Sequence, residues 1–156
     1  MAFMFVYLTN SHDRLFASQY QTYRINVDRA SGSSVNEPLV QSYQDGKYNE
    51  VIEDFRRLGT QSVTDRMIAA FAYMEVNNYQ AAIPLLDQVI RSNVITGEKL
   101  YQDEAEYYLA LSYLKTKQVE RSFQLFNKIY IDNEHTFNGR VNKWFMMRLK
   151  WLRQRS

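Results

Sequence analysis

The sequence has no cysteine, and only two histidines, two prolines and five glycines occur among its 156 residues. Without cysteine the chain can form neither disulfides nor a thiolate metal site. The few glycines form no clustered loop of the kind that cradles phosphates. The two histidines, His12 and His135, stand far apart, and neither has a second histidine at ligand spacing. We therefore expect no metal and no cofactor.

Signals for catalysis are also missing. There is no Gly-x-Ser-x-Gly segment, which marks the nucleophile turn of many hydrolases. The densest group of acids is Asp103, Glu104 and Glu106, and we interpret it as the negative charge that favours the first turn of a helix. We predict that the chain is not an enzyme.

No apolar run approaches the roughly 20 residues that a membrane-spanning helix needs. The apolar residues 1–8, MAFMFVYL, lack the basic start and the cleavage site of a secretory signal. Two interpretations remain: this segment docks on the rest of the protein, or it is the remnant of a longer membrane helix. The first fits a cytoplasmic protein, and the second a periplasmic or otherwise extracytoplasmic one.

Apolar and aromatic residues are abundant, at 46% and 15% of the chain, with twelve tyrosines and nine phenylalanines. Between residues 103 and 130 they recur at steps of three and four, which is typical of amphipathic helices. Tyr107, Leu111 and Leu114 fall on a first helix, and Val119 and Phe126 on a second. This stretch predicts two short helices joined by a tight polar turn.

The pattern of residues 103–130 recurs at 65–90 and, more weakly, at 37–58. Tyr48, Tyr79 and Val119 correspond to one another just after the turn, at spacings of 31 and 40 residues. The surplus in the second interval falls in Ser92–Tyr101, which we interpret as an enlarged loop. The other aligned positions are Val51, Ala82 and Ser122, followed by Phe55, Leu86 and Phe126.

These spacings bracket the period of roughly 34 residues found in tetratricopeptide repeats. The residues that match that family's pattern are Gly46, Phe55, Ala70, Tyr73, Ala82, Ala110, Tyr113, Ser122 and Phe126. Over residues 36–131 the chain thus resembles a tetratricopeptide-repeat (TPR) protein, similar to bacterial membrane-anchored TPR domains. Asn77 and Lys117 depart from the pattern by replacing the usual turn glycine. The resemblance implies an all-α fold, a right-handed α–α superhelix of about three helix pairs plus a C-terminal capping helix.

The predicted organisation is an N-terminal apolar and aromatic arm with a Ser-rich linker at 1–35, then a repeat domain with its capping helix at 36–156. The linker is Asp28–Asn36, DRASGSSVN. The capping helix is predicted over Arg140–Arg153, starting near Asn138. Its five basic residues, with Arg155 just beyond it, and its two tryptophans also fit contact with an anionic membrane or an acidic partner. We do not expect nucleic acid as the partner.

In TPR proteins the first helix of each pair lines an inner groove that binds a peptide or a partner's helix. The resemblance carries this role to Val40, Tyr43, Met67, Phe71, Met74, Tyr107, Leu111 and Leu114. These residues are apolar, unlike grooves that clamp a terminal carboxylate. We predict a noncatalytic protein–protein interaction scaffold. The alternative is a membrane-associated or extracytoplasmic module of a larger membrane-anchored assembly, held by residues 1–8 or 140–153.

An exposed stripe of this size strongly favours being covered. The arm carries complementary apolar residues, among them Leu15, Phe16, Tyr20 and Tyr23. We expect the arm, or its copy from a second subunit, to lie along the groove, so that a partner protein must displace it.

Overall fold

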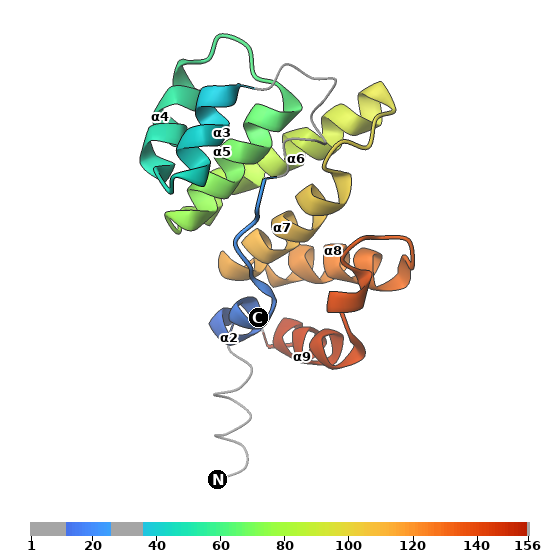
Figure 1. The fold of residues 1–156 in the computed structure, drawn as a ribbon. Helices are drawn as coiled ribbons and strands as arrows, with labels where there is room; N and C mark the ends of the chain where they lie inside the picture. Colours follow the sequence, from blue (N-terminus) through green and yellow to red (C-terminus); the bar gives the residue numbers. More distant parts are fainter. Residues whose placement is uncertain (1–11, 26–35, 156) are drawn as a thin grey trace. The chain divides into compact units, whose positions relative to one another are not determined.

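The computed structural model describes residues 12–25 and 36–155, and all regular structure within them is helical (Figure 1). The described residues divide into two compact units, one of residues 12–21 with 106–155 and one of residues 22–105. We call them the terminal unit and the central unit. The expected boundary at residue 35 separates the arm from the repeats, whereas the arm itself is shared between the two units. Residues 1–8 lie outside the described residues, and so does the predicted linker apart from its last residue, Asn36.

The central unit contains α3 (Glu37–Gln44), α4 (Tyr48–Arg57), α5 (Val63–Glu75) and α6 (Tyr79–Thr96). Local sequence sets where these helices begin. The side chains of Asn36 and Asn78 accept hydrogen bonds from backbone N–H groups at the starts of α3 and α6. Ser62 and Asp65 form a reciprocal capping box at the start of α5. The α5 helix packs on both α4 and α6, with three of its alanines fully buried.

The terminal unit contains α2 (His12–Gln19), α8 (Val119–Ile131), a 3-10 turn at Asn138–Arg140 and α9 (Lys143–Arg153). The helix α7 (Gln102–Lys115) begins in the central unit and continues into the terminal unit from Glu106. Ser122 Oγ donates a hydrogen bond to the carbonyl oxygen of Ala110, at 2.9 Å, and both residues are fully buried. The helices α7 and α8 therefore approach closely at two small residues.

The turns within all three helix pairs have the same geometry. Gly46, Asn77 and Lys117 each adopt a left-handed backbone, with φ of 74°, 61° and 62°. At each turn the N–H of this residue donates a hydrogen bond to the carbonyl oxygen three positions earlier. The N–H of the next residue donates to the carbonyl oxygen five positions before itself. That pair of hydrogen bonds is the Schellman motif, which satisfies carbonyls at a helix end. The three turns therefore share one backbone conformation and one hydrogen-bond pattern.

Two predicted boundaries are wrong. The first half of Ser92–Tyr101 is helical, because α6 continues to Thr96 and ends at Gly97, which adopts φ of 75°. The last helix begins at Lys143 rather than near Asn138, because Asn142 caps it by accepting the N–H of Phe145. Asn138 instead opens the preceding 3-10 turn. At the start of α9, a second asparagine with cap chemistry lies four positions further along the chain.

The α9 helix packs on α8 and α2 within the terminal unit (Figure 1). One face of α9 is buried there, and it consists of Phe145, Met146, Leu149 and Leu152. The α9 helix is therefore part of the core of the terminal unit.

Candidate functional site

All eight residues predicted to line the groove are buried, with at most 6% of any of them exposed. Val40, Tyr43, Met67, Phe71 and Met74 belong to the central unit, on α3 and α5. Tyr107, Leu111 and Leu114 belong to the terminal unit, on α7. Part of the N-terminal arm contacts these residues in each unit.

In the central unit the arm residue Tyr23 lies against the first helices of two pairs. Its ring stacks on Phe71 with the ring centroids 4.4 Å apart. Tyr43 Oη donates a hydrogen bond to the carbonyl oxygen of Tyr23 at 3.0 Å. Tyr23 Oη in turn donates to Glu104 Oε1 at 3.4 Å. Residues 20–25 form neither helix nor strand, so the backbone groups here are available to partners outside the segment.

In the terminal unit two tyrosines of α7 bind the arm backbone in the same way. Tyr107 Oη donates to the carbonyl oxygen of Gln19 at 2.9 Å. Tyr108 Oη donates to the carbonyl oxygen of Gln21 at 2.8 Å. Burial raises the pKa of Tyr107, and Arg140 opposes that shift, so the hydroxyl keeps its proton at neutral pH. The hydroxyls of Tyr43, Tyr107 and Tyr108 therefore act as donors to the main chain of one segment.

The helical part of the arm, α2, docks through its apolar face and its charges. Leu15 and Phe16 are 1% and 6% exposed. Lys115 Nζ lies 2.6 Å from Asp13 Oδ1 and 5.1 Å from the centre of the Phe16 ring. The hydrogen bond from Lys115 lowers the pKa of Asp13. The pKa of His12 is lowered, first by burial and then by the charge of Lys117.

Glu104 and Glu106 do more than supply charge at a helix start. Asp103 and Glu104 lie in the first turn of α7, as predicted, but Glu104 also accepts the hydrogen bond from Tyr23. Glu106 is buried and pairs with Lys128 Nζ at 2.5 Å. The buried His135 places its Nε2 atom 4.0 Å from Glu106 Oε2. Glu106 therefore links α7, α8 and the loop before the 3-10 turn within the terminal unit.

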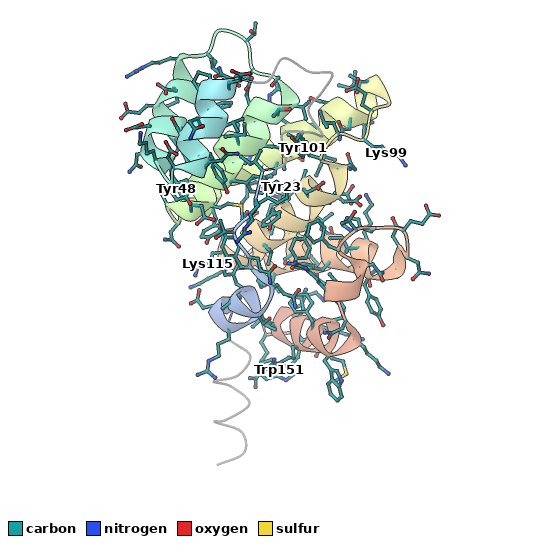
Figure 2. All side chains as sticks on the ribbon, viewed as in Figure 1. Tyr23, Tyr48, Lys99, Tyr101, Lys115 and Trp151 are labelled. Carbon is teal, nitrogen blue, oxygen red and sulfur yellow. The ribbon has the colours of Figure 1, made fainter. Side chains whose placement is uncertain are left out.

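An open depression in the central unit adjoins the arm. It is lined by Thr22–Ile25 together with Tyr43, Gln44 and Tyr48. Tyr23 and Tyr48, which border it, are labelled in Figure 2. The rings of Tyr43 and Tyr48 meet edge to face, with centroids 5.4 Å apart. Here the arm is accessible from solvent at its edge.

Sequence reasoning missed Tyr108, Glu104 and Lys115 as contacts of the arm. Tyr108 directly follows a predicted groove residue, and helical periodicity assigns neighbours to different faces. The high tyrosine content was the available signal, because buried tyrosine hydroxyls usually have a hydrogen-bond partner.

In the part of the chain that the structure describes, no three His, Cys, Asp or Glu side chains gather as a metal site requires. None of the helices in residues 12–25 and 36–155 has the length and apolarity needed to cross a membrane. Comparisons of the chain with protein-family models, curated proteins and solved structures found no match.

Proposed function

We propose that this protein is a noncatalytic TPR-like scaffold that binds an extended peptide or an amphipathic helix of a partner protein. The binding surface is formed by the first helices of the pairs, α3, α5 and α7, arranged as in a right-handed superhelix. The partner segment takes the place of the N-terminal arm on these helices.

The observation that carries this proposal is the set of hydrogen bonds from tyrosine hydroxyls to the arm backbone. Tyr43, Tyr107 and Tyr108 donate to the carbonyls of Tyr23, Gln19 and Gln21. Such bonds recognise the main chain of a peptide whatever its side chains are, and each contributes about 1 kcal/mol net. Main-chain recognition combined with apolar side-chain contacts is a recurring mode of peptide binding.

The repeated geometry of the three helix pairs supports the same proposal. Gly46, Asn77 and Lys117 end the first helices with one shared motif, which presents those helices in the same local way. Met67 and Met74 among the groove residues suit a surface that packs against different ligands, because methionine side chains adapt readily.

The arm acts as an intramolecular competitor of the partner. A tethered segment experiences an effective concentration in the millimolar range. A partner peptide must therefore bind more tightly than the arm does at that concentration. Binding of the partner therefore depends on displacement of the arm.

A peptide of residues 12–25 labelled with a fluorophore tests the proposal, with binding measured by anisotropy. The full-length Leu15→Ala, Tyr23→Ala variant has a weakened arm, since each change removes a packed side chain of the arm. We expect the peptide to bind this variant at least about tenfold more tightly than it binds the unmodified protein. The matched control is Tyr130→Ala, which changes an exposed tyrosine on α8.

Circular dichroism of the variant measures whether it keeps its helices. Should Leu15→Ala unfold the terminal unit, the milder Phe16→Leu replaces it. Hydrogen exchange gives an independent measurement, with faster exchange expected in α5 and α7 when the arm is weakened. Equal peptide binding by the variant and the unmodified protein, together with unchanged exchange, would refute the proposal.

A further inference from the structure

The outward face of α9 combines aromatic and basic side chains. Trp144 is 73% exposed and Met147 is 50% exposed, and Trp151 is partly exposed on the same helix (Figure 2). Steps of three and four residues join these three positions, so they share one face. The opposite face, with Phe145 and Leu149, is buried in the terminal unit. Packing within the described residues therefore leaves a large aromatic surface on α9 uncovered.

Positive charge borders this aromatic surface. Lys143 and Lys150 are exposed on the same side of α9, one step of four and one of three from Met147. No carboxylate among the described residues lies within ion-pair distance of either lysine. Arg155 places its guanidinium 4.0 Å from the centre of the Trp151 ring. Residues 140–156 contain six basic residues and no acid.

One basic residue of α9 is paired within the terminal unit. Glu120 of α8 pairs with Arg153, at 3.7 Å, and the Arg153 guanidinium also lies 3.9 Å from the centre of the Phe123 ring. Arg153 is therefore engaged within the terminal unit. Lys143 and Lys150, on the exposed face, have no such carboxylate partner among the described residues.

We infer that this face of α9, made of Trp144, Met147 and Trp151 with Lys143, Lys150 and Arg155, docks on an anionic phospholipid surface. Tryptophan favours the boundary between headgroups and acyl chains, while lysine and arginine attract anionic headgroups. A single convex helix with an aromatic centre and a basic border matches a flat membrane surface. The inference is independent of the proposed peptide binding, which uses α3, α5 and α7.

The sequence provides a direct reporter, because its only two tryptophans both lie on α9. We propose to titrate the full-length protein with phosphatidylcholine vesicles, with and without phosphatidylserine, and with acyl chains brominated near the headgroup. Co-sedimentation measures binding, and bromine quenching of tryptophan fluorescence measures whether α9 enters the interface. We expect binding that requires phosphatidylserine, weakens with salt and quenches the tryptophans.

Matched variants locate the surface. Trp144→Ala with Met147→Ala should weaken vesicle binding by more than about tenfold. Lys143→Glu with Lys150→Glu should weaken it by at least about tenfold. Val94→Ala with Ile95→Ala is the control, because these residues are 79% and 84% exposed at the end of α6 and have no role in the surface. That control should leave binding unchanged.

Three results would overturn the inference. The first is binding without tryptophan quenching, which would assign attachment to residues 1–8 alone. The second is failure to bind anionic vesicles, including the case in which poly-glutamate or a single-stranded oligonucleotide binds instead. The third is unchanged vesicle binding by a folded Trp144→Ala, Met147→Ala variant.

Discussion

At the scale of single residues, the three turns show that different residue types adopt the same backbone conformation. Gly46, Asn77 and Lys117 occupy the same left-handed position. Glycine adopts it without strain, and asparagine tolerates it better than most residues. Lysine has neither advantage. Lys117 is therefore the most strained of the three turn residues.

We predict that Lys117→Gly stabilises the protein by about 1 kcal/mol, because it removes the strain of a left-handed side-chain-bearing residue. Urea denaturation followed by circular dichroism measures the change. Asn77→Gly should give a smaller gain. Gly46→Ala should destabilise the protein, although its new Cβ would meet no atom within 4 Å, because the backbone conformation itself is unfavourable. Loss of stability in Lys117→Gly would contradict this account of the turns.

Burial and charge at single residues also show what periodicity leaves out. Glu106 pairs with Lys128, and it faces His135 further along the chain. Both partners are more than twenty positions away in the sequence. The apolar periodicity that predicted α7 indicates which side chains share a helix face. It contains no information on which residues far along the sequence will pair with them.

At the scale of elements, α2 docks through a titratable residue as well as through its apolar face. The pKa of His12 is lowered by burial and by Lys117, while Asp13 acts in the opposite direction. A histidine with a lowered pKa stays neutral in the folded protein at a pH where the unfolded chain already binds a proton. Acid therefore favours release of α2.

We predict that the stability of the protein falls as the pH is lowered through about 6.5, the ordinary histidine value, because only the unfolded state then gains a proton at His12. The depressed pKa of Asp13 adds a second loss, at a lower pH, as the Asp13–Lys115 pair is protonated. Urea midpoints between pH 7.5 and 5.5, the range about the ordinary histidine value, measure the first effect. His12→Gln should flatten this dependence, and a slope identical to that of the unmodified protein would exclude His12 as its source.

At the scale of the whole molecule, the last helix completes the core of the terminal unit. Leu149 is fully buried on α9, which packs on α8 and α2. Met147 lies on the same helix but is half exposed. Substitutions at these two positions can therefore distinguish the structural role of α9 from the role proposed for its outward face.

We predict that Leu149→Ala costs about 2–5 kcal/mol of unfolding free energy, the usual range for a buried leucine. Met147→Ala is the matched control and should stay within about 0.5 kcal/mol, as most surface changes do. Thermal and urea denaturation of both variants measure the difference. Equal stabilities would mean that α9 is an appendage of the terminal unit rather than part of its core.

Much of the fold could be predicted from the sequence alone. The first and second helices of all three pairs begin and end within a few residues of the predicted ranges, apart from the longer α6. Periodicity and turn residues act locally, so a single sequence reports them. The start of α9 was missed because Asn138 and Asn142 both have cap chemistry, and Asn142 is the residue that caps the helix. The end of α6 was missed because the extra residues of the longer repeat interval were assigned to a loop.

The sequence by itself determined that the chain forms helix pairs and that thiol chemistry is absent. Only the tertiary structure decided which segment covers each apolar face and which hydroxyl meets which carbonyl. The physical reason is that a hydrophobic stripe specifies burial without specifying an occupant. The contacts of Tyr107 with Gln19 and of Tyr43 with Tyr23 join residues 88 and 20 positions apart, and such contacts exist only once the chain has folded.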